Sequence, residues 1–202
     1  MRKVLVFVLL ACVCLGVSAK FRWGPVVGVN FSDYHWKQDL VQSDMGVGYS
    51  AGVMGELMIP GIGFGIDMGL RYCNRGGKVY FNQQPIWALD GIGETDLRCH
   101  TLQIPIDLRF KWTRLDGFEQ YLAPIVFAGP LFNFNLATSK CDAIEKAAGS
   151  VGIQCGLGVE IYRHFQLTGG YLWGLTYDLR TLKLDNFSTR TQGWFIDLSY
   201  LF

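Results

Sequence analysis

The chain has 202 residues, of which 50% are hydrophobic and only 17% are charged, and its formal net charge at pH 7 is +1. This near-neutral balance, together with the lack of a long basic run, excludes a general electrostatic attraction to nucleic acid, so we expect no nucleic-acid partner. The length is enough for one domain with a sizeable core.

The N-terminal residues 4–17 form a continuous apolar run that follows two basic residues. The run is too short for a comfortable membrane-spanning helix and has the order of charge and hydrophobicity of a secretory signal peptide. We therefore expect residues 1–19 to be a signal peptide that is cleaved after Ala19, and residues 20–202 to form the mature domain. A lipoprotein-type cleavage, which would leave Cys12 as a lipidated N-terminus, is the alternative.

The mature sequence alternates apolar residues with glycine and polar residues, which is the period-two pattern of β-strands. The alternation is most regular over residues 61–72, where one face holds only glycine, Asp67 and Arg71. The wholly apolar opposite face suits contact with lipid better than the core of a soluble β-sandwich, which is the alternative. Eight segments of this kind predict strands at residues 23–31, 48–58, 61–72, 101–112, 120–131, 150–161, 165–175 and 192–202.

The connections between these strands alternate between short and long. Long polar segments occupy residues 32–47, 73–100, 132–149 and 176–190, and the third of them is expected to hold one helical turn near residues 142–148. Outer-membrane barrels alternate long outer loops with short periplasmic turns, and each predicted strand is long enough to cross a bilayer. The sequence therefore predicts an all-β fold, an eight-stranded antiparallel up-and-down transmembrane β-barrel that lies in outer-membrane lipid as a monomer.

Charged residues within the predicted strands all lie on the glycine-rich face. A Lys or Arg that faced lipid at the bilayer midplane would cost about 2–4 kcal/mol, so this separation supports a barrel. Eight strands enclose a space that side chains just fill, and desolvated charges there must pair. We expect a lumen charge network made of Glu56, Asp67, Arg71, Asp107, Arg109, Lys111, Glu160 and Asp197. This network would prevent conduction, and a small porin-like channel is the alternative.

Aromatic residues gather at the ends of the predicted strands, where membrane barrels have interfacial girdles. The expected periplasmic girdle contains Trp23, Trp112, Tyr121, Tyr162, Tyr200 and Phe202, and the expected outer girdle contains Phe31, Tyr49, Tyr72 and Trp173. The last strand also has apolar residues at alternate positions up to the end of the chain. We interpret Tyr200 and Phe202 as an assembly signal that the barrel-insertion machinery reads.

Two cysteines take the inward parity at the base of the longest loop, Cys73 after the third strand and Cys99 before the fourth. Opposed positions in neighbouring antiparallel strands lie within disulfide reach, so we predict a Cys73–Cys99 disulfide. The bridge would hold residues 74–98 as one compact surface, with Ile86 and Trp87 available for a partner. Two unpaired thiols in a variable loop are the alternative.

Residues that could perform chemistry form no recognisable set. The histidines His35, His100 and His164 are too scattered to indicate a metal site or a catalytic triad, and glycines at period two are no phosphate-binding loop. We therefore predict no catalytic, cofactor-binding or metal-binding residues. Residues 32–35, Ser-Asp-Tyr-His, leave a barrel enzyme that acts on membrane lipid as the alternative.

Six segments of the mature chain carry a family resemblance: WGPVVGVNFS (23–32), GYSAGVMGEL (48–57), LRYCNRGGKVY (70–80), LQIPIDLRFKW (102–112), VFAGPLFNF (126–134) and GLGVEIYRHFQLTGGYLWGLT (156–176). In this order they resemble the small outer-membrane β-barrel family of Bacteroidetes-type bacteria, whose best-known members are the PorT-type proteins. The resemblance implies an outer-membrane barrel without a catalytic motif, and for PorT-type proteins a part in a secretion system. We therefore expect a non-enzymatic barrel that anchors outer loops for envelope assembly, secretion or contact with an envelope or secretion partner.

Overall fold

The computed structural model describes residues 20–36, 42–59, 62–80, 94–113, 117, 120–138, 144–146, 149–177, 179–181 and 188–202. Eight long strands dominate this part of the chain: β1 (Lys20–Trp36), β3 (Gly46–Met58), β4 (Phe64–Tyr80), β5 (Glu94–Lys111), β6 (Leu122–Thr138), β8 (Gly149–Ile161), β9 (Phe165–Gly174) and β11 (Ser188–Tyr200). Three short strands accompany them: β2 (Gln42–Asp44), β7 (Ile144–Lys146) and β10 (Leu179–Thr181). Among the described residues, no helix is long and apolar enough to cross a membrane.

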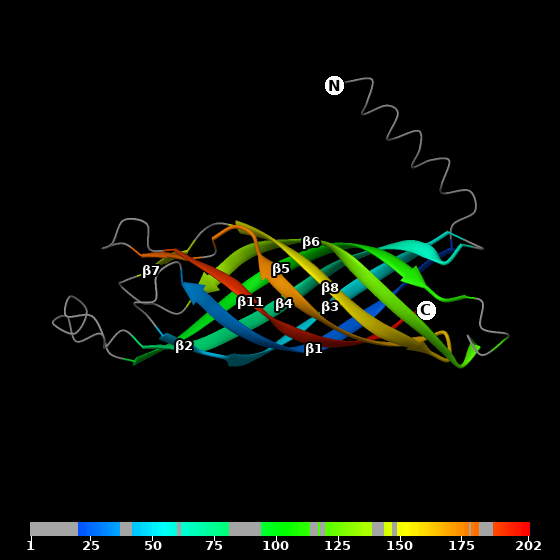
Figure 1. The fold of residues 1–202 in the computed structure, drawn as a ribbon, viewed down its shortest axis with the longest axis horizontal. Helices are drawn as coiled ribbons and strands as arrows, with labels where there is room; N and C mark the ends of the chain where they lie inside the picture. Colours follow the sequence, from blue (N-terminus) through cyan, green and yellow to red (C-terminus); the bar gives the residue numbers. More distant parts are fainter. Residues whose placement is uncertain are drawn as a thin grey trace, which may run out of the picture.

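The eight long strands pair antiparallel in chain order, and the last pairs with the first, which closes the sheet into a barrel (Figure 1). The closing ladder runs from Val26 opposite Ser199 to Trp36 opposite Thr189. Closure pairs the backbone groups that an open edge would leave without partners, a defect that hydrocarbon does not tolerate. The prediction of an all-β, eight-stranded, antiparallel up-and-down barrel is therefore confirmed.

The two ends of the barrel differ. One end, which we name the turn end, holds the start of β1, the turn between β8 and β9, and the last residues. There the Leu201 N–H donates to the His164 carbonyl (2.8 Å) and the Phe202 N–H donates to the Trp23 carbonyl (2.9 Å). The opposite end, the loop end, holds β2 and β7 (Figure 1). The sequence pattern predicts short turns on the periplasmic side, and the turn end is the end that holds them.

Several strands are longer at the loop end than the sequence pattern predicts. β4 continues past the predicted end at Tyr72 to Tyr80, and β5 begins at Glu94 instead of Thr101. β1 and β6 also continue past their predicted ends. The extensions are held by backbone hydrogen bonds between strands, and these bonds form whatever the side chains are. The extensions therefore need no apolar face toward lipid, and they lack the regular apolar alternation. The predicted loop at residues 73–100 is therefore in part a strand pair.

Two further local predictions need correction. The helical turn expected near residues 142–148 is wrong at 144–146, which form β7 and pair with β10. The strand expected from residue 61 begins instead at Phe64, because Gly63, at φ 77°, lies in the turn that precedes it. A positive φ of this kind is readily adopted only by glycine, so the turn is fixed at this position.

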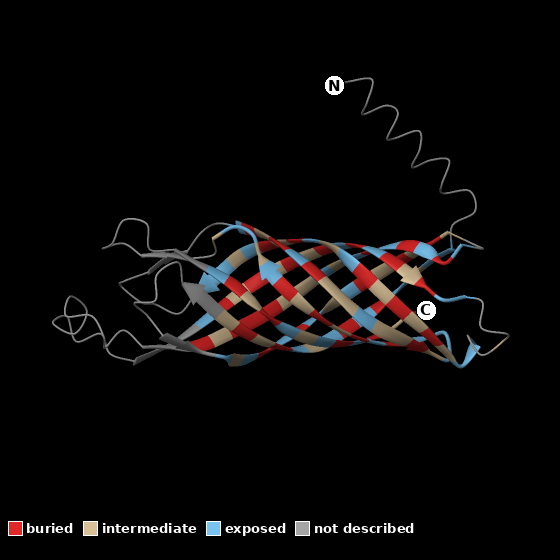
Figure 2. Ribbon diagram, in the orientation of Figure 1, coloured by how far each residue is buried: buried red, intermediate tan, exposed pale blue. Residues whose placement is uncertain are grey.

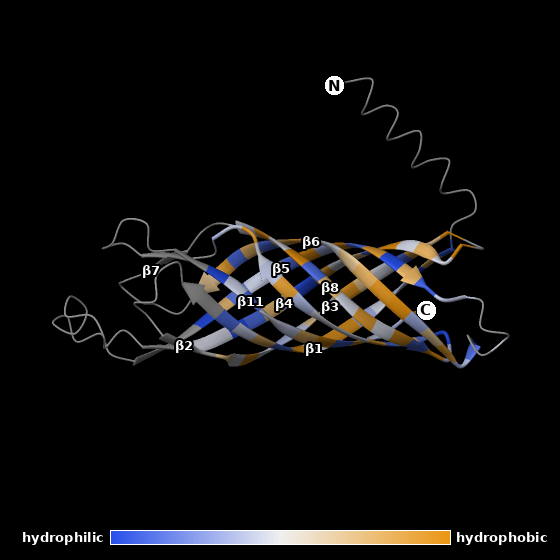
Figure 3. Ribbon diagram, in the orientation of Figure 1, coloured by the Kyte–Doolittle hydropathy of each residue, from blue (hydrophilic) through white to orange (hydrophobic). Residues whose placement is uncertain are grey.

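The side chains of each long strand alternate between an exposed and a buried face, as Figure 2 shows. The exposed face is apolar, for example at Val27 (53% exposed), Leu108 (60%) and Leu157 (67%). Hydrophobic residues recur along the whole wall of the barrel (Figure 3). Contiguous apolar surface of this extent is unusual for a protein in water and is the surface that lipid covers.

Aromatic rings meet near both ends of this apolar wall. At the turn end, the ring centroids of Trp23 and Phe202 lie 5.3 Å apart. On the loop-end side, those of Tyr49 and Tyr72 lie 6.4 Å apart. The rings of Trp23, Tyr49 and Tyr72 are apolar in body and polar at the tip, which suits the level of the lipid headgroups, so these pairs mark the two edges of the membrane-spanning wall.

Candidate functional site

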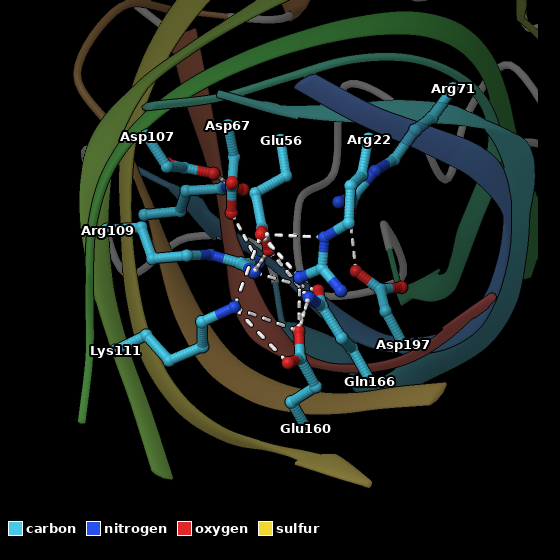
Figure 4. A network of polar contacts seen from close by, with 11 residues as sticks. Arg22, Glu56, Asp67, Arg71, Asp107, Arg109, Lys111, Glu160, Gln166 and Asp197 are labelled. Carbon is cyan, nitrogen blue, oxygen red and sulfur yellow. Dashed lines mark hydrogen bonds and ion pairs between the residues drawn. The ribbon is translucent and has the colours of Figure 1, made fainter. Parts of the chain in front are cut away.

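Six of the long strands bring polar side chains to one level of the lumen, on the side of the turn end. Each side chain takes the inward parity of its strand, so the pleat alone directs it into the lumen. We name this group the Arg109 cluster, and Figure 4 shows its members converging. They are Arg22 of β1, Glu56 of β3, Asp67 of β4, Arg109 and Lys111 of β5, Glu160 of β8 and Gln166 of β9.

Arg109 lies at the centre of the cluster, with only 1% of its side chain exposed. Its guanidinium forms ion pairs with Glu56 through Nη1 and with Asp67 through Nη2. The Arg109 Nη1 also donates a hydrogen bond to Gln166 Oε1 at 2.9 Å. The planar fork of an arginine can serve several acceptors at once, which a lysine ammonium at this position could not do in the same geometry.

A second layer of contacts joins Glu160 to the same group. The Lys111 ammonium lies 3.2 Å from Glu160 Oε2 and 3.4 Å from Glu56 Oε1, so it bridges the two carboxylates. The Arg22 guanidinium bridges the same two carboxylates from the opposite wall. Gln166 Nε2 donates to Glu56 at 2.7 Å and to Glu160 at 2.9 Å. Glu56 thus receives contacts from four side chains, and the lumen is crossed from wall to wall.

The Arg109 cluster is electrically balanced. Its three cations, Arg22, Arg109 and Lys111, face three carboxylates, those of Glu56, Asp67 and Glu160. Desolvated charges are stable only when they are paired and hydrogen-bonded, and this arrangement meets both conditions for Glu56 and Glu160. The cluster therefore links six strands across the lumen, and removal of any one charge would leave its partners buried and uncompensated.

The other three residues of the predicted network lie closer to the loop end. Arg71 forms an ion pair with Asp197, and the Ser50 hydroxyl donates to Asp197 Oδ1 at 3.4 Å. Asp107 accepts a hydrogen bond from Gln154 Nε2 at 2.6 Å. The structure thus divides the eight predicted residues into the Arg109 cluster and this separate group.

Two members of the Arg109 cluster, Arg22 and Gln166, are absent from the predicted network. Arg22 was excluded because the first strand was predicted to begin at Trp23, although Arg22 has the same inward parity as Gly24. Gln166 was excluded because only charged residues were considered. Both residues would be found by a search that includes every polar residue of inward parity and extends each predicted strand by two residues at its ends.

The predicted disulfide is not present: Cys73 and Cys99 form no bridge. Both thiols face the lumen and are buried, but Cys73 lies opposite Thr101, and Cys99 lies opposite Arg75. The cysteines are therefore offset along the ladder instead of directly opposed. The docking surface expected between them begins as a strand pair, and Ile86 and Trp87, which were expected to contact a partner, lie outside the described residues.

The residues of the expected assembly signal lie at the turn end. The Tyr200 ring lies 5.0 Å from Phe165 and 5.2 Å from Phe202, measured between centroids. Phe202 is 63% exposed, although its backbone N–H is bonded to Trp23. The end of the chain is therefore attached to the beginning of β1, and its ring remains accessible.

His100 and His164 lie toward opposite ends of the barrel. His100 Nδ1 lies 2.5 Å from the Tyr72 hydroxyl on the loop-end side, and His164 Nδ1 lies 2.9 Å from the Leu201 carbonyl at the turn end. Within the described segments, no group of three or more His, Cys, Asp or Glu side chains is arranged to hold a metal ion. These positions give no support to a shared histidine site.

Two cavities lie on either side of the Arg109 cluster. At the turn end, a vestibule of about 480 Å³ is lined by members of the cluster together with Lys20, Arg163 and His164. Toward the loop end, a cavity of about 30 Å³ is lined by Arg71, Arg75 and several polar neighbours. The cluster separates the vestibule from this smaller cavity.

Residues 17–177 match the family model described as an outer membrane protein β-barrel domain. The outer membrane protein OprG from Pseudomonas aeruginosa is similar in structure, with a TM-score of 0.60 and 11% identity over 92% of this chain and 96% of that chain. Ail of Yersinia pestis gives a TM-score of 0.48 with 12% identity over 91% and 99% of the two chains. Neisserial surface protein A gives 0.48 with 13% identity over 92% and 99%. No curated protein matches the chain.

Proposed function

Because this chain belongs to the outer membrane protein β-barrel domain family and is an outer-membrane protein, we propose that it is a closed, non-enzymatic anchor. In this role the barrel conducts no solute and presents its loop end to a partner in envelope assembly or secretion, as the PorT-type resemblance suggests. The surrounding outer-membrane lipid is then a solvent for the apolar wall and not a substrate.

The observation that supports this proposal most strongly is the partition formed by the Arg109 cluster. A solute that entered from the turn end would meet Glu56 and Arg109, whose side chains are 0% and 1% exposed. Passage would require several buried ion pairs to separate in a confined space, where an unpaired charge is costly. An eight-stranded barrel has little room to move these side chains aside.

The strand extensions support the second half of the proposal. Beyond Tyr72, β4 continues for eight residues to Tyr80, where it still pairs with Glu94 of β5. At about 3.3 Å per residue, this adds roughly 26 Å of chain along the strand direction. A paired ladder of this length loses less conformational entropy when a partner binds than a free loop would lose. The loop end is thus a rigid support for a contact surface.

Conduction is tested with the refolded barrel in liposomes and in planar bilayers, beside a large porin as the positive control. We expect sugar-driven swelling no faster than that of empty liposomes, and no stepwise conductance. Rapid swelling by the wild-type barrel would instead support the porin-like channel. Release of fatty acid from the liposome lipid would support the barrel enzyme.

Partner binding is tested by purification of the native membrane complex, followed by mass spectrometry. The wild-type chain is compared with a variant that lacks residues 83–91 and with a matched variant in which the same segment is replaced by a Gly/Ser linker of equal length. We expect at least one envelope or secretion protein to co-purify with the wild type but with neither variant. If every co-purifying protein also binds both variants, the segment between β4 and β5 is not the contact.

A further inference from the structure

The smaller cavity, which lies between the Arg109 cluster and the loop end, is lined by a buried cation for which the described residues supply no ion-pair partner. Arg75 of β4 takes the inward parity, is only 6% exposed and lines this cavity. Among the residues that the structure describes, no carboxylate forms an ion pair with it. A largely buried guanidinium without an ion-pair partner among the described residues is favourable only if water or an anion solvates it, so this position attracts negative charge.

The charges that line the cavity do not cancel. Arg71 and Arg75 contribute two positive charges and Asp197 contributes one negative charge, so the lining has a net charge of +1. Asp197 is already paired with Arg71. Within this lining, one additional negative charge would therefore bring the cavity to neutrality.

Two further donors in the same cavity are unused. The Ser32 hydroxyl and the Arg71 Nε–H are buried and have no hydrogen-bond partner. With the Arg75 guanidinium they supply donors from β1 and β4 to one lining. Donors that are buried and unsatisfied, next to an uncompensated cation, are the features of an anion site. Asn30 Oδ1 also lacks a partner there and, as an acceptor, suits a water molecule beside the anion.

The size of the cavity limits the anion. Its volume is about 30 Å³, which is room for about two water molecules. We infer that the loop-end half of the lumen binds one small monovalent anion, of the size of chloride or bromide, between Arg75, Arg71 and Ser32. Phosphate esters, sugar acids and nucleotides are too large for this space. The inference is independent of the proposed anchoring role, because it concerns an ion held inside the barrel and not passage through it.

Unfolding of the purified barrel in detergent tests this inference. Folded and unfolded barrels migrate differently on gels, so the midpoint temperature can be measured in sodium chloride, sodium bromide and sodium gluconate at one ionic strength. Equal ionic strength keeps general screening constant, and gluconate is too large for the cavity. We expect chloride and bromide to raise the midpoint in a saturable way relative to gluconate.

The variants Arg75→Gln and Lys20→Gln each remove one positive charge. Lys20 is exposed at the turn end, so Lys20→Gln should keep the full halide response. Arg75→Gln should lose it, and Arg75→Lys should keep a weaker response because the charge remains while the fork is lost. An equal halide response in Arg75→Gln and the wild type would overturn the assignment.

Anomalous scattering from bromide-soaked crystals of the wild type gives a direct readout, and it stands even if Arg75→Gln does not fold. We expect one bromide peak within hydrogen-bond distance of the Arg75 guanidinium. Density for water alone, or a carboxylate of the chain itself placed on Arg75, would disprove an anion site.

Discussion

Arg109 and Glu56 form an ion pair at the centre of the lumen, and neither side chain has appreciable access to solvent. Arg109 belongs to β5 and Glu56 belongs to β3, and these two strands are separated by β4 in the sheet. The pair therefore bridges strands that share no backbone ladder. Its neighbours Lys111, Arg22 and Gln166 all contact Glu56 as well, so this carboxylate is the common acceptor of the cluster.

The first prediction concerns this carboxylate. Glu56→Gln keeps the shape of the side chain but removes its charge, which leaves Arg109 and Lys111 with less compensation. We expect the free energy of unfolding to fall by about 3–5 kcal/mol, the usual cost of removing one partner from a buried ion pair. Urea titration, followed by the gel shift between folded and unfolded barrels, measures the change. The exposed Lys20→Gln serves as the control, and its effect should stay within about 0.5 kcal/mol.

The position of Glu56 also shows what the sequence could predict. Alternation assigns each residue to the inside or the outside of the barrel, because the strand period of two is exact for every pleated strand. Glu56, Asp67, Arg109 and Glu160 were all assigned to the lumen on this basis, and the structure places them there. The number of strands follows from the same pattern, since lipid demands an uninterrupted apolar face for the whole span.

Height along the barrel axis could not be predicted in the same way, because it depends on the register between strands. Cys73 and Cys99 share the inward face, yet Cys73 lies opposite Thr101, and the β5–β6 register shifts between His100 and Thr101. The apolar alternation that identifies a strand also ends at Tyr72, because polar residues occupy both faces of β4 beyond it. The division of the charged residues into two groups is a register property as well.

The second prediction concerns close packing inside the wall. A Cβ added to Gly28 would lie 1.9 Å from Asp197 Oδ1 and 2.8 Å from the Ile196 carbonyl. Gly28→Ala should therefore displace Asp197 and lower the free energy of unfolding by about 1–3 kcal/mol. Gly169→Ala is the matched control, because its Cβ would come no closer than 3.6 Å to the Phe195 carbonyl. Equal stability of the two variants in urea titration would contradict the packing argument.

The third prediction concerns the lipid-facing surface. Leu157 lies in the middle of β8 and is 67% exposed on the apolar face. Leu157→Arg would place a charge in hydrocarbon, and we expect it to destabilise the barrel in lipid vesicles by about 2–4 kcal/mol. Leu157→Gln should cost less, because it introduces no charge. If Leu157→Arg unfolds at the same denaturant concentration as the wild type in vesicles, this face does not contact the hydrocarbon core.

The last prediction concerns assembly. Phe202 joins the residues after β11 to the start of β1 at the turn end, because its N–H donates to the Trp23 carbonyl and its ring lies 5.3 Å from the Trp23 ring. The ring is nevertheless mostly exposed, so it is accessible to a protein that recognises an aromatic ring after β11. Deletion of Phe202 removes both the hydrogen bond and the ring, whereas Phe202→Ala removes only the ring.

If the barrel-insertion machinery reads this ring, both changes should reduce the fraction of chain that reaches the heat-modifiable, membrane-inserted form in cells. Phe202→Tyr should insert as the wild type does, since it keeps an aromatic ring at an interfacial position. Refolding of the same variants into detergent without any machinery separates assembly from stability. A deletion variant that inserts normally in cells would show that Phe202 is only a residue that follows β11 and carries no assembly signal.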